Sequence, residues 1–341
     1  MTNDMTRGNP TRLIISFTLP VLFGNLCQQL YGMVDSIIVG RAISMEALAA
    51  VGATSGISFL VIGCIQGLTA GFSVITAQRF GAGDYEGVKR SVATSALLSL
   101  AATVLLTAAG ILTARPLLEV MNTPADIIED SYAYIIVIYY GVAATAFYNL
   151  LSCIIRALGD SKTPLIFLVF ASFLNVALDL LFIITFHMGV GGAAWATVLA
   201  QLLSVALCLL YLARRYPQLL FRREDRRLDR GLLRRTVSYG AVSALHQSSL
   251  YIGKLLVQGA VNSMGTPMIS AYTATTRIEG FANSFGDSGA QAVSVFTAQN
   301  TGAGEERRVR EGFRTSFLMM LALGAVMSVL LYAAAPAAIA L

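Results

Sequence analysis

Nine long apolar blocks constrain this chain more than any other feature of its sequence. Each holds about 20 or more mostly apolar residues, and short charged stretches separate them. A helix needs about 20 apolar residues to cross the hydrocarbon core of a bilayer. Because no connector is long enough for a separate soluble domain, the sequence predicts an all-α, polytopic protein whose function lies within the membrane. The blocks cover residues 13–39, 49–76, 92–112, 132–155, 165–186, 193–213, 237–261, 268–298 and 317–335.

The composition excludes most other classes of protein. Hydrophobic residues make up 56% of the chain and charged residues only 13%, against about 25% charged in soluble domains. The four cysteines lie in apolar blocks without CxxC spacing, so they are predicted to be packing residues rather than metal ligands or disulfides. We find no nucleophile with a base, no metal-ligand cluster and no phosphate loop. The chain is therefore predicted not to be an enzyme and not to require a cofactor.

The basic residues predict how the chain is oriented. With a cytoplasmic N-terminus, 20 of the 24 lysines and arginines would lie on the cytoplasmic side, and only Arg41 and Arg115 would lie outside. The positive-inside rule thus predicts a multi-pass protein of the inner (plasma) membrane with a cytoplasmic N-terminus. The basic run Arg214–Arg235 could bind nucleic acid or anionic lipid. We interpret it instead as a stop signal between two halves, and predict the lipid bilayer but no nucleic acid as a partner.

An internal repeat divides the chain. The segment SVITAQRFGAGD at residues 73–84 recurs 221 residues later as SVFTAQNTGAGE, with eight identities in twelve positions. Six predicted helices separate the copies, so both have the same orientation, as in carriers with parallel repeats. This predicts a six-helix lobe at residues 1–213, a linker at 214–235 and an incomplete lobe of three helices at 236–341. Nine of an expected twelve helices would be present, in a C-terminally truncated chain or, alternatively, a natural nine-helix protein.

Two predicted helices carry matching polar stripes with i, i+3, i+7 spacing, which places each stripe on one helix face. Each stripe ends in a carboxylate. Two carboxylates with an amide and hydroxyls suit a small cation or a shared proton. The alternative is a pair of independent buried carboxyls that only fix helices. Pro20, in the first helix, can bend that helix. The stripes are Gln28, Tyr31 and Asp35, and Ser172, Asn175 and Asp179.

Several stretches resemble transporters of the multidrug and toxic compound extrusion (MATE) family, over essentially the whole chain. They are Leu19–Arg41, FLNVALDLLF around Asn175 and Asp179, Gly191–Gln201 and Ala271–Phe281. The similar subgroup keeps its key carboxylates in the N-terminal lobe.

This resemblance implies a secondary active antiporter that exports amphipathic organic cations or drugs in exchange for H⁺ or Na⁺. It implies a monomer in which ion binding bends the first helix at Pro20 and expels substrate. The ion-coupling or Na⁺ site would be Asp35, Asn175, Asp179 and Thr197, and the substrate cavity would be lined by Gln28, Tyr31, Tyr134, Asn149 and Ser172.

Two charged residues of the second half depart from the family pattern. Lys254 and Asp287 lie within predicted helices, where they could pair, or Lys254 could extend toward the interface. Two alternative functions remain open. A lipid-linked precursor flippase of the same superfamily would need basic residues in its cavity, and only Lys254 and Arg277 could serve. A truncated chain could also be a membrane remnant that does not transport.

Overall fold

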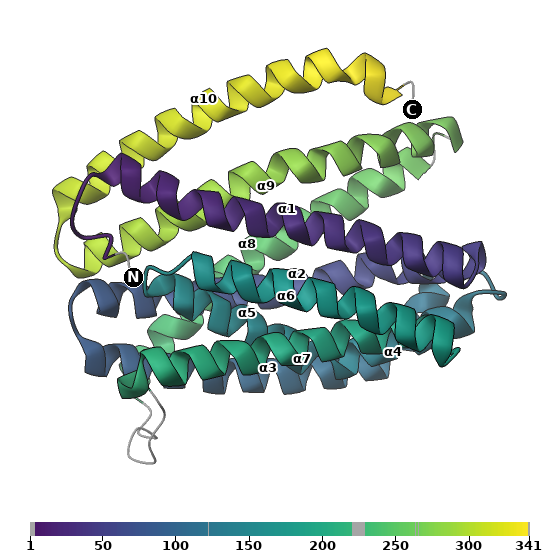
Figure 1. Cartoon of the computed structure of the whole chain (residues 1–341), viewed down its shortest axis with the longest axis horizontal. Coiled ribbons are helices and arrows are strands. Elements are labelled where there is room, and N and C mark those ends of the chain that lie inside the picture. The colour runs from purple at the N-terminus through teal and green to yellow at the C-terminus, as the bar shows by residue number, and fades with distance from the viewer. Residues whose placement is uncertain (1–3, 122, 220–228, 263, 265, 340–341) are drawn as a thin grey trace.

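The computed structural model describes residues 4–121, 123–219, 229–262, 264 and 266–339, and every regular element in these ranges is helical, as predicted (Figure 1). A π-helix at Leu180–Thr185 and a 3-10 helix at Pro217–Leu219 accompany ten α-helices. These are α1 (Pro10–Ala42), α2 (Met45–Gly81), α3 (Tyr85–Val120), α4 (Ile128–Tyr140), α5 (Val142–Ala157), α6 (Lys162–Asp179), α7 (Gly189–Arg215), α8 (Arg230–Asn262), α9 (Thr266–Gly302) and α10 (Glu306–Ile339). We refer to α1–α7 as the first lobe and to α8–α10 as the second lobe.

Each predicted apolar block falls on one long helix or on a consecutive pair. Block 132–155 covers α4 and α5, which meet at Gly141 with a bend of 46°. Among the described residues, six helices are long and apolar enough to span a membrane, or seven if the bent pair is one span. The helices α8 and α9 do not reach this criterion, because polar residues interrupt their apolar sequence. The predicted count of nine spans is therefore not established. Residues 220–228 of the predicted linker lie outside the described ranges.

Side-chain caps set the beginnings of the first three helices. The Asn9 side chain accepts a hydrogen bond from the Arg12 amide at 3.3 Å, and Pro10 occupies the first helical position. Ser44 caps α2 and Asp84 caps α3 in the same way, at 3.1 and 2.8 Å. Such residues satisfy backbone amides that have no partner inside the helix. These three helices therefore begin at well-defined residues in short polar segments.

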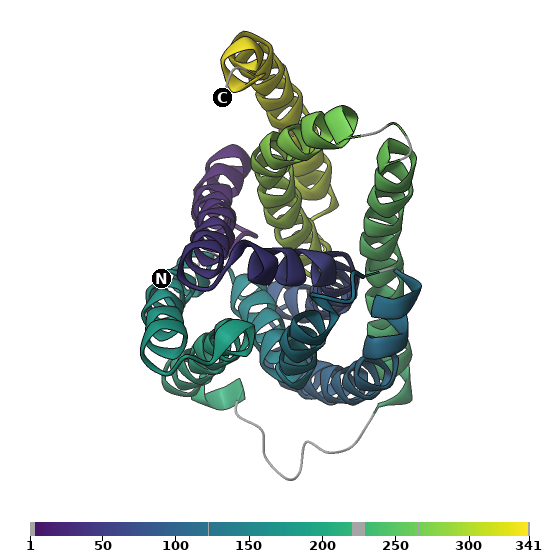
Figure 2. The ribbon, with the colours of Figure 1, turned by 90° about the vertical axis from the view of Figure 1, so that its right-hand side faces the viewer.

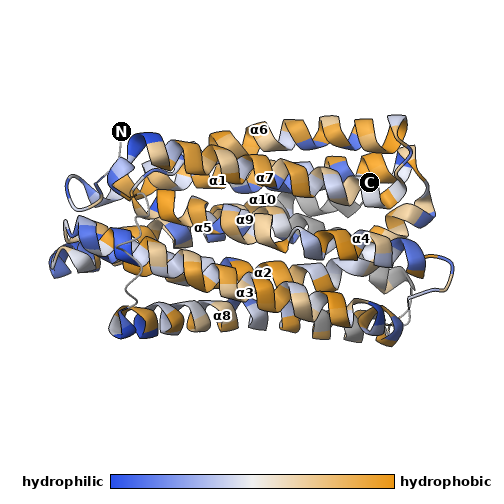
Figure 3. Cartoon of the chain, turned by 90° about the horizontal axis from the view of Figure 1, so that it is seen from below, coloured by the Kyte–Doolittle hydropathy of each residue, from blue (hydrophilic) through white to orange (hydrophobic). Residues whose placement is uncertain are grey.

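The bundle has a broad apolar belt with hydrophilic ends (Figure 3). Large side chains in the middle of helices point outward, as with Leu112 (78% exposed), Phe173 (73%) and Leu105 (70%). In water such a surface would cost about 25 cal/mol per Å², whereas lipid chains cover it at no such cost. The chain is therefore a multi-pass membrane protein.

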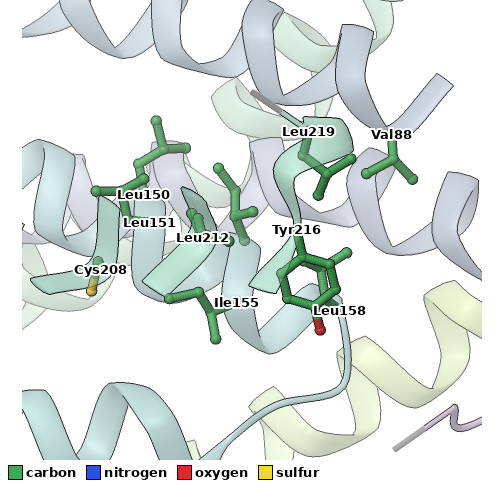
Figure 4. Close-up of a cluster of buried hydrophobic side chains, with 10 residues drawn as sticks. Val88, Leu150, Leu151, Ile155, Leu158, Cys208, Leu212, Tyr216 and Leu219 are labelled. Carbon is green, nitrogen blue, oxygen red and sulfur yellow. The ribbon is translucent and has the colours of Figure 1, made fainter. Parts of the chain in front are cut away.

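Interior packing concentrates between α3, α5 and α7 (Figure 4). Leu150, Ile154 and Ile155 of α5 are buried against Cys208 of α7 and Val88 of α3. Cys208 acts here as a small apolar residue, as predicted. The cluster stabilises the end of the first lobe where α7 leads into the 3-10 helix.

The repeat is also present in the helix boundaries. The helices α2 and α9 span 45–81 and 266–302, and α3 and α10 begin at 85 and 306, each 221 residues apart. The turns match as well. The amides of Ala82 and Ala303 each bond back four residues at 3.0 Å, and Gly83 and Gly304 have φ of +69° and +74°, a region that favours glycine.

The two copies contact each other where α2 and α9 end. A Cβ on Gly81 would lie 1.9 Å from the Gln299 carbonyl oxygen, and one on Gly302 would lie 1.8 Å from that of Gln78. The two contacts are equivalent under the repeat, so the helices cross on a local two-fold axis. This crossing lies at the end of the bundle that carries the N-terminus, at the left in Figure 1. In the end view, α10 lies at the edge of the bundle (Figure 2).

Candidate functional site

The two predicted carboxylates meet inside the first lobe. Asp35 lies on α1, and Asp179 is the last residue of α6 and is completely buried. The two carboxyls are close enough to interact electrostatically. Asp35 lies about 10 Å from the C-terminal end of α1, at 1.5 Å per residue. The pair therefore occupies the half of the bundle opposite the N-terminus.

Thr197 of α7 connects the two stripes. Its hydroxyl is hydrogen bonded to the Tyr31 hydroxyl of α1 at 3.1 Å and accepts a bond from the Asn175 amide of α6 at 3.3 Å. Tyr134 of α4 lies near Tyr31 and both carboxylates. Four helices thus converge on one polar group. We call it the carboxylate site, consisting of Tyr31, Asp35, Tyr134, Asn175, Asp179 and Thr197.

Four oxygens in this site are buried without a hydrogen-bond donor. They are Oδ1 of Asp35, both carboxylate oxygens of Asp179 and Oδ1 of Asn175. A buried acceptor without a partner costs about 1–3 kcal/mol, and more when it is charged. A shared proton or a small cation with hard oxygen ligands would satisfy these atoms. The arrangement is therefore chemically suited to exchange H⁺ or Na⁺.

A π-helix follows directly after Asp179, and sequence reasoning missed it. It covers Leu180–Thr185, inside a block that the apolar pattern predicts as one uninterrupted helix. Isolated π turns are rare and occur often at functional sites. The change of helix type ends the regular ladder at the carboxylate, and neither hydrophobicity nor a breaker residue signals it.

Other predicted cavity residues lie outside this group of contacts. Gln28 is exposed on α1, while Asn149 and Ser172 each donate to a carbonyl of their own helix, at 2.8 and 2.9 Å. Pro20 lies within α1, about 22 Å along the helix from Asp35.

Sequence reasoning also missed Gln201. Its Oε1 atom is buried without a donor, and it lies four residues after Thr197, on the same face of α7. Gln201 ends the Gly191–Gln201 stretch, which resembles the family, and this position is the sequence feature that could have identified it. Gln201 thus extends the polar face of α7 beyond the carboxylate site.

The structure does not pair Lys254 with Asp287, which was one of the two arrangements considered from the sequence. The Lys254 ammonium lies 3.2 Å from Oε1 of Glu279, whose carboxylate also accepts from Asn283 at 3.0 Å. Lys254 thus forms its ion pair with Glu279 rather than Asp287, since Glu279 reaches it across the α8–α9 contact. Asp287 is near enough to Lys254 and His246 to interact with them electrostatically. The Arg277 side chain lies outside the described part of the chain.

Comparisons with known proteins point to one family of transporters. A model of the MatE family matches residues 20–181 and 243–341. The Probable multidrug resistance protein YpnP of Bacillus subtilis is 30% identical over 307 residues, which cover 90% of this chain and 68% of that protein. The Probable multidrug resistance protein NorM of Thermotoga maritima is 25% identical, over 92% of this chain and 69% of that protein.

Solved structures show the same fold. The crystal structure of MATE in the bent conformation superposes with a TM-score of 0.91 at 26% identity and covers 98% of this chain and 75% of that one. The outward-facing conformation of a multidrug resistance MATE family transporter also gives 0.91 at 26% identity, over 98% of this chain and 74% of that one. The chain therefore belongs to the MatE family of multidrug and toxic compound extrusion transporters.

Proposed function

We propose that this transporter is a secondary active antiporter that exports amphipathic organic cations in exchange for H⁺ or Na⁺ bound at the carboxylate site. One observation carries the proposal: four buried oxygens of Asp35, Asn175 and Asp179 have no donor. Ionisable residues inside a membrane are costly and usually mark an ion pathway. A site that needs a cation to be stable, and that lies within a multidrug transporter fold, suits ion coupling.

The chemistry of the site favours positively charged substrates. Its charged members are carboxylates, and the aromatic residues Tyr31 and Tyr134 lie close to them. Aromatic rings attract organic cations by about 0.5–2 kcal/mol. A cationic drug and the coupling ion would therefore compete for the same negative charge, which is the basis of exchange.

The helix α1 offers a route from the site to the second lobe. At one level it holds α7 through the Tyr31–Thr197 bond. At another, Asn25 donates to the Ser288 hydroxyl of α9 at 2.9 Å. Since ion binding neutralises the carboxylates that α1 shares with α6, it would alter how α1 packs, and Pro20 would allow the helix to bend. We propose that this bending exposes the drug site alternately to the two sides of the membrane.

We also propose where the protein lies in the cell and which oligomeric state it has. The distribution of basic residues favours the inner membrane with the N-terminus in the cytoplasm, and we propose a monomer that performs transport rather than enzymatic chemistry. Of the two basic residues that a flippase cavity could use, Lys254 is paired with Glu279, and this pairing favours the antiporter.

Drug efflux tests the proposal. Energised cells that express the chain should export ethidium or norfloxacin, and Asp35→Asn should abolish export because it removes the exchangeable charge. Asp126→Asn, which changes an exposed carboxylate in the α3–α4 connector, should leave export unchanged. Export that survives in Asp35→Asn would refute the proposed role of the site. Absence of export from a stably inserted parent chain would favour the non-transporting remnant.

The coupling ion can be determined separately. Proteoliposomes with an imposed pH gradient, or with an imposed Na⁺ gradient at equal pH, should accumulate ethidium under one of the two. Thr197 and Asn175 offer neutral oxygen ligands as well as donors, so either ion fits. Accumulation under neither gradient would contradict antiport.

A further inference from the structure

The six residues before α1, Asp4–Asn9, form a strap across the N-terminal end of the bundle. Met5 is completely buried, in a cluster with Ile14, Phe17 and Phe296. The Met5 amide donates to Oε1 of Gln299 at 2.9 Å. A segment outside the helices is thus anchored in the interior, and its anchor joins the first lobe to α9.

Arg308 of α10 fixes the strap from the second lobe. Its guanidinium donates to the carbonyls of Met5 and Gly8, at 3.1 and 2.8 Å, and to Oδ1 of Asn300 at 2.8 Å. Asn300 in turn donates to the Met5 carbonyl at 3.1 Å. Gly8 has φ of +95°, a conformation that glycine adopts without strain and that directs its carbonyl to Arg308. All of these partners of the strap belong to α9 or α10.

The same residues also hold the lobes together directly. Gln299, which binds the strap, donates to the carbonyl of Ala157 at the end of α5, at 2.8 Å. Its backbone lies against Gly81 in the crossing of α2 and α9. Strap, crossing and the α5 contact therefore close one end of the boundary between the lobes.

Differences between the two repeat copies coincide with the strap. In the first copy, Arg79 pairs with Asp84 at 2.8 Å, and Gly87 leaves no space for a side chain, since its Cβ would lie 2.2 Å from Asp84. The equivalent positions in the second copy are Asn300 and Arg308. Both bind the strap. The second copy therefore has residues that hold Met5 and Gly8 at the positions where the first copy has Arg79 and Gly87.

We propose that the Asp4–Asn9 strap is an interlobe latch, which keeps the N-terminal end of the transport pathway closed and must release Arg308 and Gln299 before that end opens. The proposal rests on the alternating access proposed above. Hydrogen bonds from a charged donor are stronger than those between neutral groups. The latch lies at the hydrophilic end of the bundle (Figure 3), where water can replace those bonds. It is thus strong enough to bias the closed state and weak enough to be reversible.

Distance measurements between spin labels test the latch without any transport assay. Labels at Glu86→Cys and Arg307→Cys, in a chain without its four native cysteines, report the separation of two exposed, repeat-equivalent sites at this end. Arg308→Gln should add a population of longer distances, and Arg308→Lys a smaller one. Arg310→Gln is the matched control, because Arg310 is exposed and lies 3.8 Å from Glu306 on its own helix. It should leave the distances unchanged.

A second variant keeps the test decisive if Arg308→Gln unfolds, which gel filtration would reveal. In a chain that keeps Arg308 and carries no spin labels, a short thiol crosslink between Met5→Cys and Asn300→Cys should stop drug efflux until it is cleaved. Unchanged distances in folded Arg308→Gln, or drug efflux that persists in the crosslinked chain, would overturn the latch. Failure of efflux in the uncrosslinked parent, with the distances shifting as expected, would instead count against the proposed drug transport alone.

Discussion

At the scale of single residues, Thr197 determines how the carboxylate site is assembled. Its hydroxyl forms hydrogen bonds with a residue of each polar stripe, Tyr31 and Asn175. The carboxylates themselves receive no donor at three of their four oxygens. Neutral hydrogen bonds thus hold the site together, while most of its carboxylate oxygens have no donor.

Replacement of Thr197 by alanine should weaken ion binding about tenfold. The loss of the hydroxyl leaves the Asn175 amide and the Tyr31 hydroxyl without this partner, and such a loss costs about 1–3 kcal/mol. Thr197→Ser keeps the hydroxyl and should stay within about twofold of the parent. Ion dependence of ethidium transport in proteoliposomes measures both variants. Equal affinities for Thr197→Ala and Thr197→Ser would show that the hydroxyl has no part in binding.

Much of this site could be predicted from the residues. The i, i+3, i+7 stripes placed Tyr31 with Asp35 and Asn175 with Asp179, and the family resemblance added Thr197 and Tyr134. Gln28 shares the spacing of its stripe but is exposed. Helical periodicity predicts which residues share a face, but it does not predict how much of that face other helices cover. The burial of Gln201 could not be predicted either, since it depends on neighbours from other helices.

At the scale of helices, length and apolar pattern predicted every long element, but not its irregularities. The bend of 46° between α4 and α5 occurs at Gly141, where a Cβ would lie 2.3 Å from Val198. A single glycine in an apolar run is compatible with a straight helix, so only packing against α7 reveals the bend. The π-helix after Asp179 was unpredictable for a similar reason.

Close crossing of α2 with α9 requires glycine, which gives a matched pair of substitutions in one helix. Gly81→Ala would place a Cβ 1.9 Å from the Gln299 carbonyl, and we expect it to destabilise the fold by about 1–3 kcal/mol. Gly52→Ala, also in α2, meets nothing within 4 Å and should be neutral or stabilise by up to about 1 kcal/mol. Thermal unfolding in detergent distinguishes them. A Gly81→Ala midpoint at or above that of Gly52→Ala would show that the helices cross elsewhere.

At the scale of the whole molecule, the parallel repeat defines the arrangement. Because α2 and α9 end in matching turns that pack on a local two-fold axis, those turns lie at the same end of the bundle. The strap, Arg308 and the α2–α9 crossing lie at this end, and the carboxylate site lies in the opposite half. The carboxylate site and the strap are thus separated along α1, the helix that contains Pro20.

Thiol labelling should determine which end faces the cytoplasm. In a chain without native cysteines, Asp126→Cys, in the α3–α4 connector, should react with an impermeant maleimide added to intact cells. Glu305→Cys, in the exposed turn before α10, should react only after the membrane is opened. The physical reason is the retention of basic segments on the cytoplasmic side. The reverse pattern of labelling would place the N-terminus outside.

We propose that drug and ion exchange at one pair of carboxylates, and simultaneous recording of both fluxes can test this claim. Proteoliposomes containing the chain, loaded with indicators of internal pH and Na⁺, should show ethidium moving one way while H⁺ or Na⁺ moves the other. Asp35→Asn should abolish both movements together, while Asp126→Asn should change neither. Ethidium movement without ion counterflow, or coupled fluxes that persist in Asp35→Asn, would contradict the claim.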